Sequence, residues 1–308
     1  MYLRKHRKVK LPFVFIIKSL FLIVPLGAYG FVFARFCYLC AVKYTDKKKM
    51  RNLLFLAIIF ATLAASGQTV RNDTRSDRNI RQYGGIIQGD TARKRIALVF
   101  TAAAWADGAD TIINTMKSRG VKGSFFFTGG FYEKFPGIIA RLVKDGHYVG
   151  SHGYAHLLYA PWGSKRDSTI VSKEEFDNDI LKGYALMAEA GIKKEDARYF
   201  IPPYEHYNST ISEWARQLGL QIINYTPGTR SNADYTTPDM KSYASSEELF
   251  ATLDKFEKEH TLNGHFLMLH FGTHPARTDK FYNLLPRIID TMQGRGYSFV
   301  TVDEMIEQ

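Results

Sequence analysis

The chain has 308 residues, which is long enough to bury the core of a sizeable folded domain without help from disulfides. Its formal charge of +11 is concentrated at one end, because residues 1–67 contain 12 of the 41 Lys and Arg residues but only one of the 30 acidic residues. The rest of the chain is therefore neutral. The basic composition is no argument for nucleic-acid binding, and we expect no nucleic-acid partner.

Residues 50–67 have the pattern of a secretory signal peptide, with a basic start, an apolar core and an exit of small residues. We interpret Met50 as the true start and residues 1–49 as an upstream extension of the reading frame. The alternative retains 1–49, with the apolar run 11–42 as a membrane segment. The first interpretation predicts a secreted or periplasmic protein, and the second predicts a membrane-anchored one. The mature domain is expected to contact the membrane only if 1–49 is kept.

The two cysteines, Cys37 and Cys40, both lie in that N-terminal segment, so the exported part contains no disulfide. Residues 68–93 are polar and charged, and we expect them to form a flexible lead-in. A regular pattern of apolar runs begins at Lys94 and continues to the end. Residues 94–308 are therefore expected to fold as one domain.

This domain alternates short apolar strands with longer amphipathic helices. The expected strands are 96–101, 123–127, 148–150, 198–201, 220–224, 265–269 and 297–301. The expected helices are 109–119, 136–144, 173–190, 209–218, 246–259 and 279–294. Strands that alternate with helices indicate a parallel α/β fold. We predict a distorted (β/α) barrel of about seven parallel strands in preference to an open doubly wound sheet.

Histidines follow two of the expected strands, where such folds place their chemistry. His152 and His156 come after the third strand, and His270 comes after the sixth. Two imidazoles four residues apart bind one divalent ion if the loop turns like a helix, although the spacing also occurs by chance. His270 has a side chain suited to general acid catalysis, or it simply caps a strand. Tyr204, after a double proline, offers a rigid backbone N–H to an oxyanion, or only marks a stiff turn.

Aromatic and polar side chains surround these histidines in the strand-end loops. Trp162, Tyr207 and Tyr235 are candidates to line a sugar groove, although packing explains them equally well. Asp234 lies in the same stretch, and we include it with Tyr204 among the candidate residues for contacts with substrate or oxyanion.

Several motifs together resemble the polysaccharide deacetylases of the NodB-homology type, carbohydrate esterase family four. The match covers roughly residues 94–307. Ser151-His-Gly-Tyr-Ala-His156 is similar to the family's metal-binding histidine motif, with Gly153 in place of Ser or Thr. Ile201-Pro-Pro-Tyr204 is similar to an Arg-Pro-Pro-Tyr motif without its arginine. Met268-Leu-His270 is similar to the Leu-x-His motif of the catalytic acid. The family fold is a distorted seven-stranded barrel.

The first family motif does not match. The family has Thr-Phe-Asp-Asp-Gly at the end of the first strand, where one aspartate is the catalytic base and the other binds metal, and this chain has Ala102–Ala104. The nearest carboxylate is Asp107. Three explanations stay open: Asp107 has taken over as ligand or base, the domain has lost catalysis and kept glycan binding, or the alanines were introduced artificially.

The resemblance implies a metal-dependent hydrolase that removes acetyl groups from an exported or cell-envelope polysaccharide or oligosaccharide. The implied metal is a divalent ion such as zinc, held by His152, His156 and Asp107, with Asp107 as base and His270 as acid. A catalytically inactive glycan-binding barrel is the alternative that the Ala102–Ala104 run favours. A different metal hydrolase, such as a phosphatase, is disfavoured because no further carboxylates stand near the histidines.

Overall fold

A computed structural model describes residues 78–163 and 168–307. The expected signal peptide at 50–67 and the segment 1–49 lie outside the described residues. Within the described part of the chain, no helix has both the length and the apolar character needed to cross a membrane.

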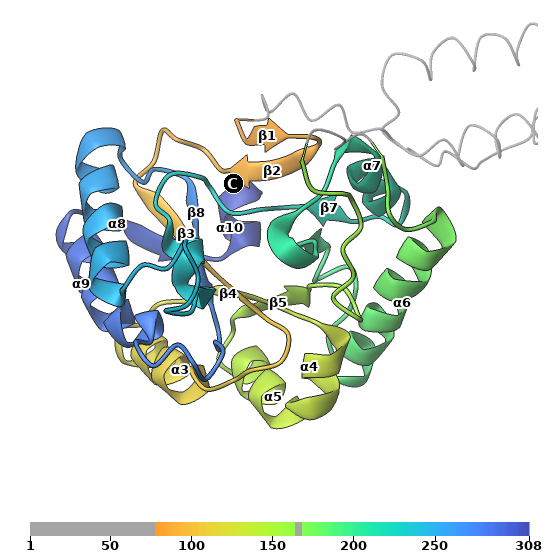
Figure 1. Ribbon diagram of the computed structural model, residues 1–308, viewed down its shortest axis with the longest axis horizontal. Coiled ribbons are helices and arrows are strands. Elements are labelled where there is room, and N and C mark those ends of the chain that lie inside the picture. Colours follow the sequence, from red (N-terminus) through yellow and green to blue (C-terminus); the bar gives the residue numbers. More distant parts are fainter. Residues whose placement is uncertain (1–77, 164–167, 308) are drawn as a thin grey trace, which may run out of the picture. The chain divides into compact units, whose positions relative to one another are not determined.

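The expected parallel strands form one curled sheet at the centre of the folded unit (Figure 1). They are β3 (Arg95–Ala102), β4 (Ser124–Phe127), β5 (Tyr148–Ser151), β6 (Tyr199–Phe200), β7 (Gln221–Ile222), β8 (His265–His270) and β9 (Ser298–Val300). Their order is β8-β3-β4-β5-β6-β7, and β9 pairs with the start of β3. The predicted α/β barrel is therefore confirmed.

An antiparallel hairpin that the sequence did not indicate lies between the two ends of this sheet. It consists of β1 (Ile80–Gln82) and β2 (Gly85–Gln88), and β2 pairs with β8. Ile86 also forms a parallel bridge with Ile223, directly after β7. The hairpin thus joins β8 to the β7 end of the sheet. The expectation of a flexible lead-in up to residue 93 is wrong for these residues, because their backbone groups complete the barrel.

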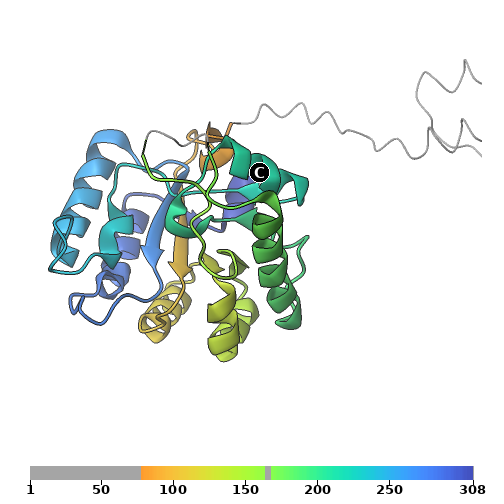
Figure 2. The same cartoon turned by 45° about the vertical axis from the view of Figure 1, so that its right-hand side comes forward.

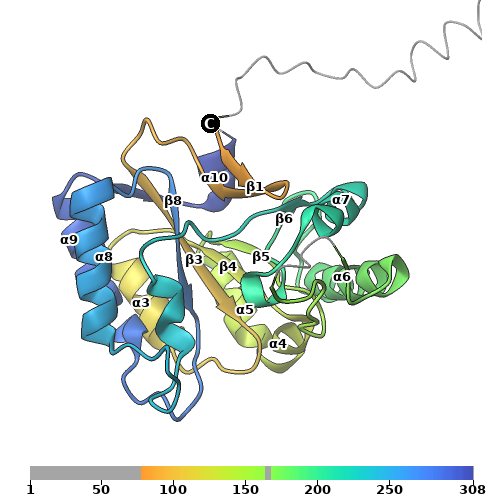
Figure 3. The same cartoon turned by 45° about the horizontal axis from the view of Figure 1, so that its top comes forward.

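Helices surround the outside of the curled sheet, as two further views of the molecule show (Figures 2 and 3). They are α3 (Ala109–Ser118), α4 (Gly129–Lys134), α5 (Pro136–Lys144), α6 (Lys173–Glu189), α7 (Ser209–Gln217), α8 (Ser246–His260), α9 (Leu285–Gly294) and α10 (Val302–Ile306). The six expected helices are confirmed, and α4 and α10 are the two that were not among them. Helix α9 begins later than expected because residues 281–284 form a 3-10 turn.

Successive residues of β3 face opposite sides of the sheet, as the period of a strand requires. Leu98 and Phe100 pack in the apolar layer beneath the outer helices, and Ala97 and Val99 pack in the barrel interior. Both sides are buried, which explains the continuous apolar runs in the sequence. Continuing the alternation, Thr101 faces the interior at the same register as His270 on β8.

Candidate active site

The carboxyl ends of four parallel strands lie at one level. Ala102 pairs with Phe127, Phe127 with Ser151, and Ser151 with Phe200. The loops after β5 and β6, the end of β8 and the loop after β3 therefore open at the same end of the barrel. This arrangement brings together the residues that the sequence placed after separate strands.

His152 and His156 lie side by side in this opening, with ring centroids 5.1 Å apart. His152 is buried, and its Nδ1 donates to the carbonyl of Ile201 at 2.9 Å. Its Nε2 is therefore the nitrogen with the free lone pair. Burial, reinforced by the neighbouring imidazoles, lowers the pKa of His152 well below its usual range and that of His156 to about 4. Both rings are neutral at pH 7, which is the form that binds metal ions.

The loop between these histidines is fixed by Asp179 on α6. Its carboxylate accepts hydrogen bonds from the backbone N–H groups of Tyr154 and Ala155, at 3.0 and 2.8 Å. It also accepts a hydrogen bond from the Tyr159 hydroxyl at 2.6 Å. Sequence analysis missed this residue because it stands in a polar helix more than 20 positions away.

Gly153 is required by the same contacts. Its φ is +77°, and a Cβ there would lie 2.7 Å from the Tyr159 hydroxyl and 2.8 Å from the Asp179 carboxylate. Both the backbone conformation and the lack of space exclude a larger residue. The departure from the Ser or Thr of the family motif is thus explained by local packing.

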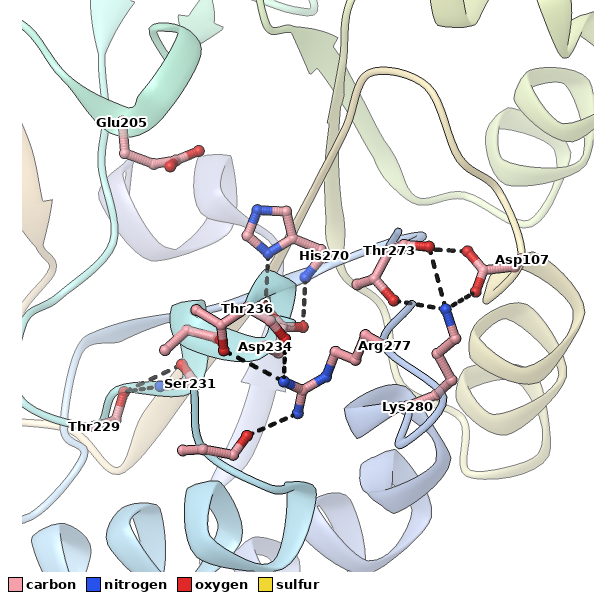
Figure 4. A network of polar contacts seen from close by, with 12 residues as sticks. Asp107, Glu205, Thr229, Ser231, Asp234, Thr236, His270, Thr273, Arg277 and Lys280 are labelled. Carbon is pink, nitrogen blue, oxygen red and sulfur yellow. Dashed lines mark hydrogen bonds and ion pairs between the residues drawn. The ribbon is translucent and has the colours of Figure 1, made fainter. Parts of the chain in front are cut away.

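His270 is paired with Asp234, which comes from the 3-10 turn Ser231–Tyr235 (Figure 4). One carboxylate oxygen accepts from His270 Nδ1 at 2.6 Å, and the other accepts from the His270 backbone N–H at 2.8 Å. Burial alone would lower the pKa of His270, but the Asp234 charge and hydrogen bond outweigh it and raise the pKa. The grouping of Asp234 with residues that contact substrate or oxyanion is corrected: Asp234 is buried and positions His270.

A buried arginine holds the turn that carries Asp234. Arg277 is fully buried and donates to the carbonyl of Thr236 at 2.8 Å and to that of Ala244 at 3.1 Å. These hydrogen bonds fix the backbone directly after the turn, so Asp234 is presented to His270 by a rigid segment (Figure 4).

Asp107 does not join the two histidines. Its side chain, 37% exposed, forms an ion pair with Lys280 at 2.7 Å and accepts hydrogen bonds from the Tyr282 hydroxyl and the Thr273 N–H, both at 2.9 Å. Figure 4 shows these contacts on the far side of the loop from the His270 ring. The sequence suggested Asp107 as ligand and base, but its carboxylate is committed to anchoring the loops after β3 and β8.

Glu205 is the carboxylate that lies beside the histidines, and sequence analysis passed over it. Its Oε1 is 3.8 Å from His152 Nε2, and its side chain is 16% exposed. Figure 4 shows the Glu205 side chain on the turn after β6, apart from the His270 ring. Burial, with a contribution from the Asp234 charge, raises the pKa of Glu205 to about 7. The available signal was an acidic residue directly after Pro202-Pro203-Tyr204 in a strand-end loop.

Three exposed aromatic side chains surround the opening. Tyr204 lies against His156, with ring centroids 4.4 Å apart, and Tyr235 lies 5.3 Å from His270. Trp162, which is 61% exposed, packs on His206 at 4.3 Å. Tyr207 is different, because it is buried and its hydroxyl donates to the Gln82 carbonyl of the β1 strand. The expectation that Tyr207 lines a sugar groove is therefore wrong.

The residues present fit a divalent metal ion in part. In the described part of the chain, no three His, Cys, Asp or Glu side chains are already gathered as a metal-binding group. Two neutral imidazoles side by side are nevertheless suitable ligands for zinc, and His152 has its orientation fixed through Nδ1. The hydroxyl of Thr101, at the register of His270, is buried without a hydrogen-bond partner in the described residues.

A barrel with two neutral histidines and a carboxylate-paired histidine at its strand ends defines a hydrolase-like class of protein. The sequence model of the polysaccharide deacetylase family matches residues 88–223. A peptidoglycan-N-acetylglucosamine deacetylase from Bacillus cereus is 24% identical over 229 residues, which cover 74% of each chain. Over these residues the domain is therefore similar to the polysaccharide deacetylases of the NodB-homology type, as its motifs indicated.

Two further similarities show the range within this family. A peptidoglycan-N-acetylglucosamine deacetylase from Listeria monocytogenes is 27% identical and matches 69% of this chain, but the match spans only 39% of that longer protein. A pseudoenzyme of carbohydrate esterase family four from Bacillus anthracis has the same fold, with a TM-score of 0.58 and 17% identity, covering 73% of this chain and 70% of the other. The fold thus occurs in both active and inactive forms.

Proposed function

We propose that this domain is a metal-dependent hydrolase that removes acetyl groups from an exported or cell-envelope glycan. One observation carries the proposal: the neutral pair His152 and His156 shares one strand-end opening with the carboxylate-paired His270. A metal ion and a proton donor are two of the components that hydrolysis of an acetyl group needs there, and the third is a base that takes the proton of the attacking water. The names of the two deacetylase relatives support the choice of an acetylated glycan.

Each residue has a distinct task in this proposal. His152 and His156 would hold the ion, for which we propose zinc, and the bound ion would supply Lewis-acid polarisation of the acetyl group and its attacking water. His270, oriented through Nδ1 by Asp234, presents its Nε2 proton to the departing amine or alcohol. Its raised pKa, caused by the Asp234 charge and hydrogen bond, favours the protonated ring. The backbone N–H of Tyr204 is the proposed oxyanion donor.

The exposed rings of Trp162, Tyr204 and Tyr235 are suited to packing against the faces of sugar rings. Each offers apolar area with a polar edge and loses little conformational entropy on binding. We propose that peptidoglycan or a related N-acetylglucosamine polymer is the first substrate to examine, because it is named in the relatives. The proposed route to such a substrate is export through the segment 50–67, or membrane anchoring if 1–49 is retained.

A second candidate function is a glycan-binding barrel without catalysis. The run Ala102–Ala104 favours it, because the family places its base and one metal-binding aspartate there. The B. anthracis pseudoenzyme is an example of a protein without catalysis on the same fold.

An acetate-release assay separates the two candidates. The full chain, its Ala103→Asp variant and its His270→Ala variant would be incubated with zinc and either peptidoglycan or chito-oligosaccharides. Zinc-dependent acetate release by the unmodified chain, lost in H270A, is the expected result. Glycan binding by both the unmodified chain and A103D, with acetate release by neither, would replace the hydrolase with the binding module.

A further inference from the structure

The side of the opening formed by the loop after β6 contains an acidic side chain in an unusual setting. Tyr204 and Glu205 both have positive φ, at 60° and 51°, although neither is glycine. Such conformations cost free energy for residues with a Cβ, and they persist only where the surroundings enforce them. A carboxylate held in this way, 3.8 Å from His152, calls for an explanation other than solvation of a surface loop.

The surroundings do enforce this conformation. Pro202 and Pro203 stiffen the approach to the turn, and the Glu205 N–H donates to the Pro202 carbonyl at 2.9 Å. The Asn224 side chain then donates to the Glu205 carbonyl at 2.7 Å. Asn224 itself is fixed, because its N–H donates to Ile86 in the barrel-closing hairpin at 2.9 Å. The position of Glu205 is thus set by the barrel itself.

The Glu205 carboxylate points at the free nitrogen of His152, but the two atoms are not hydrogen-bonded. The 3.8 Å between Oε1 and Nε2 exceeds hydrogen-bond length. Two ligands of one tetrahedral zinc ion, each about 2.1 Å from the metal, lie roughly 3.4 Å apart. A small side-chain adjustment therefore lets both atoms bind one ion. Within the described residues, no hydrogen-bond donor engages this carboxylate, so it is available.

We propose that Glu205 is the carboxylate ligand of the metal site, which it supplies from the loop after β6 in place of the aspartate that is absent after β3. The inference rests on the proposed metal-dependent function and specifies its ligand set as His152, His156 and Glu205, three described side chains that are not already gathered around one point, so that the ion would draw them together. Two histidines and one glutamate form a known type of catalytic zinc site, which leaves a position open for water or substrate. Asp107 is excluded from this set because its carboxylate is held in an ion pair with Lys280.

Zinc affinity tests the assignment without relying on activity. The full chain would be titrated with Zn²⁺ against a chromogenic chelator, and the visible spectrum of its Co²⁺ form would report the ligand set. Glu205→Gln preserves size and shape but provides a poor ligand, and we expect it to weaken zinc binding by about 100-fold or more and to change the Co²⁺ spectrum. Glu247→Gln removes the same charge from the exposed face of α8 and should bind zinc like the unmodified chain.

Two further variants keep the outcome decisive. Glu205→Gly relieves the positive φ, so it should fold at least as stably as the unmodified chain while binding zinc as weakly as E205Q. Asp107→Asn should retain zinc affinity within about threefold, which is well below the loss expected from removal of a ligand. Unchanged zinc affinity in E205Q, or a loss in D107N equal to that expected for E205Q, would overturn the assignment.

The results also separate this inference from the proposed function. Glu205-dependent zinc binding without acetate release would leave the ligand assignment standing and remove the hydrolase. Acetate release by the unmodified chain, with unchanged zinc binding in E205Q, would leave the hydrolase standing and remove the ligand assignment. A chain that binds no zinc would overturn both.

Discussion

The loop after β3 and the loop after β6 meet at the same end of the barrel, and they carry opposite kinds of side chain. The β3 side presents Ala102–Ala104, and its nearest carboxylate, Asp107, is turned to Lys280. The β6 side presents Glu205 in a strained backbone next to His152. Loss of the family's aspartate motif after β3 therefore does not by itself remove a metal site, because the strand ends of a barrel meet at one face and another strand end can supply the ligand.

The two carboxylates that fix the loops provide the largest contrast in stability. Asp179→Ala leaves three donors without their acceptor in a buried place, so we expect it to cost about 3–5 kcal/mol of unfolding free energy. Asp107→Ala removes a carboxylate that is 37% exposed and should cost about 1 kcal/mol. Urea denaturation measures both. Equal losses at the two positions would contradict the view that Asp179 is the stronger of these two anchors.

Gly153 tests the same loop through its backbone. Gly153→Ser places a Cβ against Tyr159 and Asp179 at a positive φ, and a cost of about 3 kcal/mol is expected. Gly191→Ser is the matched control, because Gly191 has a φ of +80° but open space around it. That control should cost only about 1 kcal/mol by thermal or urea unfolding. Similar costs for the two variants would show that the contacts of Gly153 are unimportant.

Strain on the β6 side predicts a gain of stability. Glu205→Gly should raise the free energy of unfolding of the zinc-free protein by about 1 kcal/mol, because glycine adopts positive φ without a steric penalty. The comparison is Ala104→Gly on the exposed β3 loop, where the φ is not positive and a loss of a few tenths is expected. Destabilisation by E205G would mean that Glu205 serves the fold.

The pairing of His270 with Asp234 predicts the direction of a pH effect. The folded-state pKa of His270 is raised, so the pair contributes stability fully below the unfolded pKa of about 6.5 and loses it as pH rises through the higher folded value. Asp234→Asn should lower the pKa of His270 in an NMR titration. It should also remove the loss of stability that the pair causes as pH rises. An unchanged pKa would show that Asp234 does not set the charge of His270.

Much of the fold was accessible from the sequence, because buried parallel strands appear as apolar runs that alternate with helices. Strands β3 and β8 were predicted nearly to the residue. The hairpin β1–β2 was not, since Ile80–Gln82 is short and exposed, and β2 gains its structure from pairing with the distant strand β8. No local sequence pattern in residues 68–93 indicates that β2 pairs with β8.

The site was accessible only in part for a similar reason. The histidines stood out because their spacing and surroundings resemble a motif, whereas Glu205 acquires its meaning from the barrel that brings it within 3.8 Å of His152. Asp107 was favoured because it is close to the alanine run in sequence, but the turn directs it toward Lys280. Closeness in sequence was the wrong guide to closeness in space.

Moving the carboxylate from one side of the opening to the other tests the central claim most directly. Ala103 directly follows the end of β3, two residues after Thr101, which pairs with His270, and the family has its aspartates at this strand end. The measurement is the zinc affinity of Glu205→Gln and of the double variant Ala103→Asp with Glu205→Gln. We predict that E205Q loses zinc affinity and that the added aspartate restores at least tenfold of it. Full affinity in E205Q, or no recovery in the double variant, would contradict the account.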